Sequence, residues 1–313
     1  MNLLGIEIGG TKLQLVLGDG GGVIQQRRQL TVARQAGAAG IREQIVRVLP
    51  ELAREVPVAA AGVGFGGPVD WQTGRICRSH QIEGWSEFDL AAWLRELVGA
   101  PVFADNDANV AALGEARHGA GAGCESMLYV TLGSGVGGGL VVGGQIYHGA
   151  KPGESEVGHL RLDRSGATVE SRCSGWAVDA RVRELVHTAS TGALARKVAA
   201  DPGGEARHLG AAWRDGDALA RRIVAETAED LAFGLSHAVH LFHPHAIVLG
   251  GGLAGVGEPL RAAVAEALHR HTMEAFAPGL DVRLTALGPD AVPVGALTLA
   301  QERLRRSEAA GSA

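Results

Sequence analysis

A chain of 313 residues with 46 % hydrophobic residues has enough apolar material for about two buried cores. A formal net charge of −5 excludes the basic surface with which proteins bind nucleic acid or an anionic membrane. The three cysteines, Cys77, Cys124 and Cys173, are odd in number and far apart. They fit neither a disulfide framework nor a Cys-x-x-Cys metal pair, and we therefore expect a cytoplasmic protein.

Two glycine-rich segments have the same order of predicted elements. The first begins at Leu3 (LLGIEIGGTKLQLVLGDGGGVI) and the second at Met127 (MLYVTLGSGVGGGLVVGGQIYHG), and both alternate strands with glycine turns. The uncharged run from Met127 to Gly144 contains seven glycines, so we predict two strands and a turn there rather than a membrane helix. Two such copies predict duplicated α/β domains that face one another, with their turns converging on one cleft.

Both glycine turns are candidate phosphate-binding sites. Turns of this kind leave several backbone N–H groups unpaired and allow oxygen atoms to approach closely, which suits phosphate. The alternative is a pair of tight hairpin turns without any ligand. The occurrence of two turns with polar residues beside them favours phosphate. The residues concerned are Gly9, Gly10, Thr11 and Lys12 in the first turn, and Gly133, Ser134, Gly135 and Gly137 in the second.

Helices and strands alternate through the rest of the chain. Apolar residues at helical spacing between Asp89, a candidate N-cap, and Gly99 predict a helix. The sequence PVFAD then predicts a buried strand, and ANVAALGEAR a helix that ends near Gly119. Residues 176–242 are mostly helical in pattern. The sequence AIVLGGG predicts a late strand, followed by a helix that begins near Glu258-Pro259.

Three groups of polar residues are candidates for chemistry. Asn106 and Asp107 stand where a predicted strand ends and a helix begins, which is where ligands bind in open α/β sheets. The alternative is that one of them only caps the helix at Ala108. Glu156 and His159 face the same way if their segment is a helical turn, and could then bind neighbouring sugar hydroxyls. The alternative there is a solvated charge pair.

Taken together, these segments resemble the ROK family of sugar kinases and regulators, in the actin-like ATPase superfold, and are closest to its glucokinase-like members. The resemblance covers nearly the whole chain. GIEIGGTK is similar to the first phosphate motif of the family and GVGFGGPVD to its interdomain segment. ADNDANVAALGEARHGAG resembles the catalytic stretch, TLGSGVGGG the second phosphate motif, EVGH the sugar motif and IVLGGGL the adenosine motif.

The resemblance implies an α/β fold of two actin-like, ribonuclease H-like domains that flank an active-site cleft. The N-terminal domain would span residues 1–116 and be completed by a C-terminal helix over 291–313, and the larger domain would span 117–290. Asp107 would be the catalytic base, and the protein a homodimer. The sugar-binding residues implied are Asn106, Glu156, His159, Glu170 and Gly67, and the adenosine-binding residues are Gly250 and Gly251.

One departure from the family concerns zinc. Members usually carry a loop with the pattern Cys-x-Cys-Gly-x-x-Gly-Cys, followed by Leu-Glu and then Ser-Gly. VESRCSG aligns with the end of that pattern, which makes Glu170 the second sugar-binding glutamate, but only ten residues separate His159 from Glu170. Because Cys173 alone cannot supply four ligands, we expect no structural zinc. Packing by Leu160, Leu162 and Val169 is the candidate replacement.

A second departure is Glu7. Family members usually have an aspartate at this position, which reaches Mg²⁺ through water. A carboxylate directed at the metal's water shell would explain an acid inside an apolar strand. The alternative is a glutamate that backbone N–H groups of the same turn satisfy. Glutamate is longer by one methylene, and Mg²⁺ keeps its waters in a tight octahedral geometry, so the change bears on activity.

We therefore expect an ATP- and Mg²⁺-dependent kinase that phosphorylates a hexose, with the 6-hydroxyl of glucose as the favoured acceptor. One alternative is a sugar-binding regulator that does not catalyse, motivated by Glu7 and the shortened loop, although a first strand at Leu3 leaves no room for a DNA-binding head. Another is a kinase for fructose or an N-acetylhexosamine, or one that uses polyphosphate as donor. The expected partners are a small sugar and a nucleotide, with neither nucleic acid nor a membrane.

Overall fold

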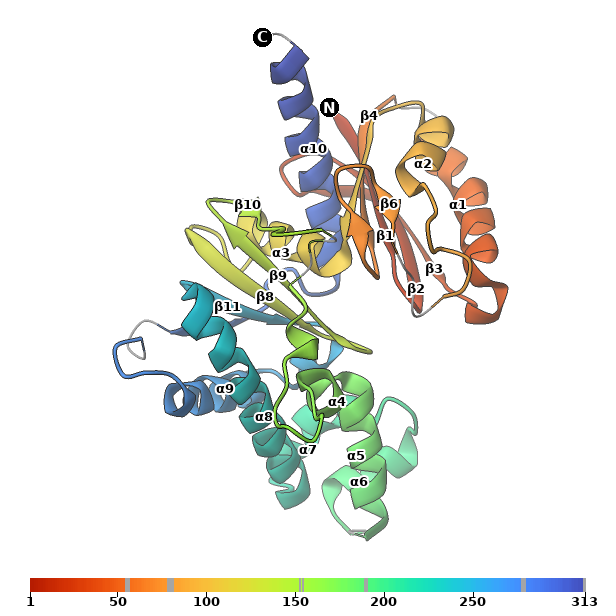
Figure 1. The fold of residues 1–313 in the computed structure, drawn as a ribbon. Helices are drawn as coiled ribbons and strands as arrows, with labels where there is room; N and C mark the ends of the chain where they lie inside the picture. The colour runs from red at the N-terminus through yellow and green to blue at the C-terminus, as the bar shows by residue number, and fades with distance from the viewer. Residues whose placement is uncertain are drawn as a thin grey trace. The chain divides into compact units, whose positions relative to one another are not determined.

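The structure of the chain is a computed structural model (Figure 1) that describes residues 1–53, 57–77, 82–151, 153, 155–188, 191–276 and 280–311. Its two five-stranded sheets and its helices confirm the α/β fold class. Contacts between Cα atoms divide the chain into two compact units. The first unit contains Met1–Glu125, Gly139–Ser155 and Pro289–Ala313, and the second contains Ser126–Gly138 and Glu156–Gly288. The domain boundaries expected after residue 116 and before residue 291 stay a prediction.

The first unit is built on a sheet with the strand order β3-β2-β1-β4-β7. Its strands are β1 (Asn2–Ile8), β2 (Lys12–Gly18), β3 (Ile24–Thr31), β4 (Val58–Phe65) and β7 (Val102–Asn106). β1 pairs antiparallel with β2 and parallel with β4, and β4 pairs parallel with β7. Leu4, Ile6 and Ile8 enter one hydrophobic core while Leu3 enters another. β1 is therefore buried on both faces, which explains its nearly continuous apolar sequence.

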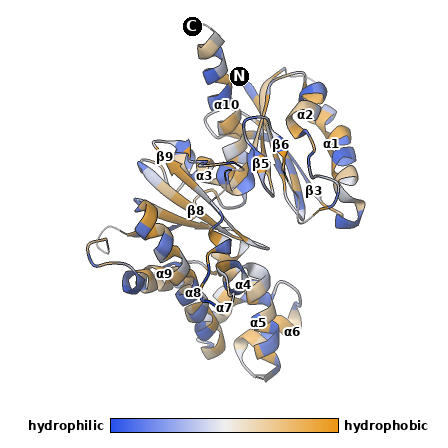
Figure 2. Cartoon of the chain, in the orientation of Figure 1, coloured by the Kyte–Doolittle hydropathy of each residue, from blue (hydrophilic) through white to orange (hydrophobic). Residues whose placement is uncertain are grey.

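The second sheet repeats this arrangement with the order β10-β9-β8-β11-β12. Its strands are β8 (Ser126–Leu132), β9 (Val136–Val142), β10 (Gln145–Ile146), β11 (Ala246–Gly250) and β12 (Asp281–Leu284). When the five strands of each sheet are numbered by their order in the chain, both sheets have the spatial order 3-2-1-4-5. This agreement supports the predicted duplication. The two strands and turn predicted over residues 127–144 are confirmed as β8 and β9, and β8 is hydrophobic over most of its length (Figure 2).

The helices agree with the expected pattern. The predicted helix after Asp89 is α2, and the side chain of Asp89 accepts a hydrogen bond from the Ala92 N–H at 3.0 Å, as an N-cap does. In the described part of the chain, no helix has the length and apolar character needed to cross a membrane. The helices are α1 (Gly37–Ala53), α2 (Leu90–Val98), α3 (Asp107–His118), α4 (Val169–Cys173), α5 (Gly175–Thr188), α6 (Ala193–Ala200), α7 (Leu209–Arg214), α8 (Ala218–Phe242), α9 (Glu258–His271) and α10 (Ala291–Gly311).

The C-terminal helix α10 packs closely against β4 and α3 of the first unit, and glycines line these contacts. A Cβ atom on Gly62 of β4 would collide with the backbone carbonyl of Ala296, and one on Gly295 with the carbonyl of Val110 in α3. The apolar residues beside these contacts, Leu297 and Leu299 among them, are almost fully buried. At each of these contacts, α10 therefore fits against its neighbour because one of the two residues lacks a side chain.

We predict that Gly62→Ala lowers the free energy of unfolding by about 1–3 kcal/mol, because the new methyl group meets backbone that a rotamer change cannot move. Gly255→Ala is the matched control, since a Cβ atom there has no neighbour within 4 Å. Urea denaturation of both variants provides the measurement. Equal midpoints for the two variants would show that α10 does not depend on this close approach.

Candidate functional site

The first glycine turn joins β1 directly to β2 in the first unit. The Gly9 N–H donates to the Lys12 carbonyl at 2.9 Å, which closes the turn, and the Arg34 Nε donates to the Gly10 carbonyl at 3.0 Å. Thr11 is exposed at the tip, and its carbonyl accepts from the Val32 N–H at 3.0 Å. A tight turn with an exposed tip is the geometry that the phosphate interpretation requires, and it is equally that of a hairpin without a ligand.

Glu7 lies beside this turn with only 9 % of its surface exposed. Lys12 Nζ lies 3.0 Å from its Oε1, and Gln14 Nε2, across the β1–β2 ladder, donates to its Oε2 at 2.7 Å. In the described part of the chain its partners are therefore side chains rather than the backbone N–H groups considered as an alternative. Burial raises the pKa of the Glu7 carboxyl above its ordinary value, although Lys12 and Gln14 oppose the shift.

The candidate catalytic residues stand at the junction of β7 and α3, also in the first unit. Asn106 is the N-cap of α3, because its Oδ1 accepts from the Ala108 N–H at 2.8 Å and from the Asn109 N–H at 3.3 Å. Its Nδ2 donates to the Gly67 carbonyl at 3.3 Å. The capping alternative is thus realised, and it coexists with a position beside Gly67, another predicted site residue.

Asp107, the first residue of α3, is half-buried and lies near the first glycine turn. A Cβ atom on Gly66 would lie 3.4 Å from Asp107 Oδ2, 3.4 Å from the Ile8 carbonyl and 3.7 Å from Gly9 Cα. Gly66, which has no side chain, therefore lies beside both the Asp107 carboxylate and Gly9 of the first glycine turn. The first unit brings together Gly9, Gly67, Asn106 and Asp107.

The second glycine turn joins β8 to β9 in the second unit. The Gly133 N–H donates to the Gly135 carbonyl at 2.9 Å, and the Gly175 N–H, at the start of α5, donates to the Gly133 carbonyl at 2.7 Å. The Val136 N–H donates to Glu170 Oε2 at 2.9 Å. Glu170, predicted as a sugar ligand, is thus hydrogen-bonded to the backbone that follows the turn.

Glu156 is the N-cap of a single 3₁₀ turn, Val157–His159, and His159 is its last residue, so the segment is the helical turn that their spacing required. His159 Nε2 lies 3.9 Å from Glu156 Oε2, and the two side chains are 73 % and 50 % exposed. A Cβ atom on Gly158 would collide with the Val136 carbonyl. The sugar motif and Glu170 therefore approach the same residue, Val136, and the structure brings these predicted ligands to one side of the second turn.

The predicted adenosine motif ends β11. Gly251 adopts φ +79°, and a Cβ atom there would lie 2.5 Å from the Leu132 carbonyl carbon at the end of β8. A side chain on Gly250 would collide with the Tyr129 hydroxyl. Gly251 is thus required by the close passage of β8 backbone, while Gly250 leaves room for the Tyr129 side chain. Their contact with adenosine stays a prediction.

The loop that lacks the zinc cysteines is held by a short hairpin. The Leu162 N–H donates to the Ala167 carbonyl at 2.8 Å, and the Val169 N–H donates to the Leu160 carbonyl at 3.0 Å. Asp163 Oδ1 caps the tip by accepting from the N–H groups of Ser165, Gly166 and Ala167 at 2.7–3.3 Å and from the Ser165 hydroxyl at 2.6 Å. Val169 is fully buried, and its side chain packs against Gly234 of α8. Val169 packs as expected, the contributions of Leu160 and Leu162 stay a prediction, and the capping role of Asp163 is an addition to this packing.

Cys173 is buried, and its thiol donates weakly to the Thr227 carbonyl at 3.6 Å. Burial raises the pKa of the thiol to about 12, so it stays protonated near neutral pH. Within the described ranges, no three His, Cys, Asp or Glu side chains are grouped as a metal site would need. The expected absence of structural zinc stays a prediction.

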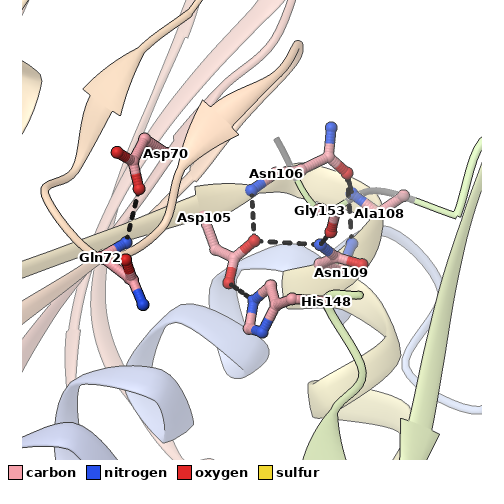
Figure 3. Close-up of polar contacts among 8 residues, drawn as sticks. All are labelled: Asp70, Gln72, Asp105, Asn106, Ala108, Asn109, His148 and Gly153. Atoms are coloured by element: carbon pink, nitrogen blue, oxygen red, sulfur yellow. Dashed lines mark hydrogen bonds and ion pairs between the residues drawn. The ribbon is translucent and has the colours of Figure 1, made fainter. Parts of the chain in front are cut away.

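Sequence reasoning missed four residues of the first unit near the β7–α3 junction, which are Trp71, Asp105, Asn109 and His148, and Figure 3 draws the last three. Asp105 is 1 % exposed, and it hydrogen-bonds to Asn106, Asn109 and His148. His148 in turn stacks on Trp71. The only local signal was an acid at the end of an apolar strand, as at Glu7, because the partners come from distant parts of the chain.

Comparison with known proteins places these features in a wider group. A model of the ROK family matches residues 3–303. The glucokinase of Halalkalibacterium halodurans is 30 % identical over 306 residues, which cover 93 % of this chain and 92 % of that protein. The crystal structure of a ROK family glucokinase from Streptomyces griseus, in complex with glucose and AMPPNP, has a TM-score of 0.85 at 29 % identity and covers 96 % of this chain and 100 % of that one. A putative xylose repressor of a Caldicellulosiruptor species is 25 % identical over 82 % of this chain and 67 % of that protein.

We predict that Glu7→Gln changes the pH dependence of unfolding. The pKa of Glu7 is raised on folding from its ordinary value of 4.5, so the folded state binds this proton more tightly than the unfolded state. The wild-type free energy of unfolding, relative to that of Glu7→Gln, should therefore fall as the pH rises from about 4.5 through the folded pKa. Urea titrations at a series of pH values measure this difference, and a constant difference would contradict the raised pKa.

Asp163→Asn is a control for which the expected change of stability with pH has the opposite sign. The pKa of Asp163 is lowered from 3.8 because the Ser165 hydroxyl and the loop N–H groups donate to the charged form. Its stabilising contribution is present above pH 3.8 and should be lost as the pH falls through the folded pKa. The same slope in both variants would mean that the titrations report another group.

Proposed function

The chain belongs to the ROK family, and on that premise we propose that it is an ATP-dependent sugar kinase that transfers the γ-phosphate to a hexose hydroxyl, with the 6-hydroxyl of glucose as the favoured acceptor. The observation that carries this proposal is the position of Asp107. Its carboxylate stands next to Asn106 and is separated from the first glycine turn by Gly66 alone. A base so close to a candidate phosphate turn is what phosphoryl transfer to a hydroxyl needs.

Asp107 supplies the general base. A sugar hydroxyl is a weak nucleophile, and a carboxylate within hydrogen-bond reach accepts its proton as the oxygen attacks. The new bond joins the sugar oxygen to the γ-phosphorus, while the bond from the γ-phosphorus to its bridging oxygen breaks and ADP leaves. Gly66 supports this role because a side chain at that position would lie against Asp107 Oδ2.

Asn106, Gly67, Glu156, His159 and Glu170 are proposed to hold the acceptor. Asn106 already uses Oδ1 to cap α3 and one Nδ2 hydrogen to bind the Gly67 carbonyl, which fixes its amide and leaves the second hydrogen for a sugar hydroxyl. Glu156 and His159 are exposed and offer an acceptor and a donor or acceptor side by side. Glu170 would keep one oxygen on the Val136 N–H and offer the other.

The nucleotide is proposed to bind through Gly9, Gly10, Thr11 and Lys12 in the first unit, and through Gly133, Ser134, Gly135 and Gly137 in the second, with adenosine against Gly250 and Gly251. Mg²⁺ bound with ATP would offset the charge on the phosphates. Glu7 fits a role outside the metal's first shell. Its oxygens accept from Lys12 and Gln14, and each keeps a lone pair to which a metal-bound water can donate.

A second candidate function is a sugar-binding regulator without catalysis. Two observations favour it: the similarity to a putative xylose repressor, and the pairing of Glu7 with Lys12, a cation that competes with any metal for the carboxylate. The presence of Asp107 argues against it. A kinase for fructose or an N-acetylhexosamine, or one that uses polyphosphate, needs the same base and differs only in its pockets. A homodimer, by family resemblance, and a cytoplasmic location, from the cysteine content, complete the proposal.

The test is ADP release with Mg·ATP across a panel of hexoses and N-acetylhexosamines. We expect a sugar-dependent signal that falls by about 10²–10⁴-fold in Asp107→Asn, because the variant keeps the shape and loses the base. Sugar affinity, measured by calorimetry, should stay close to that of the wild type. Asp89→Asn is the matched control, since Asp89 also begins a helix of the first unit and asparagine caps as well as aspartate.

Undiminished turnover in Asp107→Asn would remove that residue from the role of base. If no sugar in the panel produces ADP release and the wild type still binds sugar measurably, the regulator without catalysis is favoured. A signal with polyphosphate that exceeds the signal with ATP would identify the other donor.

A further inference from the structure

Asp105 is a buried acid, and its two carboxylate oxygens have different hydrogen-bond partners. Its Oδ1 accepts from the Asn106 N–H at 2.8 Å and from Asn109 Nδ2 at 3.0 Å, so it holds both the end of β7 and the first turn of α3. Its Oδ2 lies 2.6 Å from His148 Nε2 (Figure 3). Because a carboxylate only accepts, the imidazole N–H is the donor in this contact. Asp105 therefore connects the residues on either side of Asp107 to a segment far away in the sequence.

His148 is itself fixed from two sides. Its side chain is only 10 % exposed. Its ring stacks on Trp71, with 4.2 Å between centroids and 15° between planes, and the Arg303 guanidinium lies 4.6 Å from the Trp71 ring centroid. A cavity of about 150 Å³ adjoins His148 and Trp71. The imidazole is held in place by stacking as well as by its hydrogen bond to Asp105.

The same contacts join the start of α3, which carries Asn106 and Asp107, to two other segments of the first unit. Trp71 lies in the turn between β5 (Val69–Asp70) and β6 (Arg75–Ile76), just after Gly67. Asn109 Nδ2 donates to the Gly153 carbonyl at 3.0 Å as well as to Asp105. One carboxylate, one imidazole and one indole thus connect the turn after β5, the start of α3 and the segment of His148, all within the first unit.

We propose that Asp105 and His148 act together as positioning residues for Asn106 and Asp107. In this role, His148 holds the Asp105 carboxylate in the rotamer in which it accepts the Asn106 N–H and the Asn109 amide. Those bonds set the direction in which α3 leaves β7, and so the directions of the Asn106 amide and the Asp107 carboxylate. The kinetic part of this inference rests on the proposed function, while the structural part does not.

The physical reason is the cost of an unpaired buried charge. If the imidazole donor is removed, Oδ2 of a carboxylate that is 1 % exposed loses its partner. An uncompensated buried charge is strongly unfavourable, so the side chain is expected to turn toward the cavity and its water. That rotation takes Oδ1 away from the Asn106 N–H and from Asn109 Nδ2. A small displacement of a catalytic group is enough to cost a large factor in rate.

The test compares three variants with the wild type. His148→Phe keeps a ring to stack on Trp71 and removes the donor. His148→Gln restores a donor near the position of Nε2. Lys151→Ala is the matched control, because it removes a different link from the same segment, the 2.9 Å ion pair with Asp70, without touching Asp105.

The first readout is hydrogen exchange, which does not depend on activity. The N–H groups of Ala108 and Asn109 are protected by Asn106 Oδ1. We expect them to exchange about tenfold faster in His148→Phe, for a loss of about 1.4 kcal/mol of local protection, and at the wild-type rate in His148→Gln and Lys151→Ala. Wild-type exchange in His148→Phe would overturn the proposal, whatever the enzyme does.

The second readout is kinetic. In His148→Phe we expect kcat/KM for the sugar to fall by about 100-fold, as for a displaced catalytic group. We expect KM for the nucleotide to be unchanged, because the hydrogen-bond partners of the Asp105 side chain among the described residues are Asn106, Asn109 and His148 and do not include the first glycine turn. Asp105→Ala should be similar, and the double variant no worse than Asp105→Ala alone, since the two residues act as one unit. A lowered Tm with unchanged kcat and KM would reduce the pair to a structural role and overturn the proposal. If the wild type shows no kinase activity with any sugar or donor, the proposed function is wrong. The positioning role of Asp105 and His148 is then still tested by hydrogen exchange.

Discussion

Buried acids at the carboxyl ends of β1 and β7 need polar partners, and the candidate site is organised around the partners that they have. Glu7 at the end of β1 is satisfied by Lys12 and Gln14 of the neighbouring strand. Asp105 at the end of β7 is satisfied by the start of α3 and by His148. An acid left without such partners would be too costly to bury. Each compensation therefore fixes a neighbouring segment, and those segments carry the residues proposed for catalysis.

The duplicated sheet explains why the two units contribute similar turns and different chemistry. Both sheets have the same strand order, and each begins with a strand, a glycine turn and a second strand. In the first unit the turn lies near an acid at a helix start, Asp107. In the second unit the turn is approached by Glu170 and by the segment that contains Glu156 and His159. The same supersecondary frame thus carries a candidate base in one copy and candidate sugar ligands in the other.

The loop before Glu170 is held by local hydrogen bonds and by packing against α8. Asp163 gathers the N–H groups of the loop tip, and the hairpin from Leu160 to Val169 anchors it on α8 through Val169 and Gly234. The chain reaches Glu170 in a defined direction because α4 begins with a capping box between Thr168 and Ser171. Side-chain capping of this kind is local and needs few residues, which suits a loop of this length.

The sequence by itself determined the regular elements, the glycine turns and the family. Strand periodicity, the Asp89 cap of α2 and the repeated glycine pattern depend on neighbours within a few residues, so they could be predicted without a structure. Only the tertiary structure decided the partners of the buried acids. Asp105 and His148 are 43 residues apart, and Trp71 comes from a third segment, so no local pattern could join them. The close approach of α10 to Gly62 likewise depends on contacts between the end of the chain and its first sheet, because it is the absence of a side chain, and not a chemical signal, that makes the contact possible.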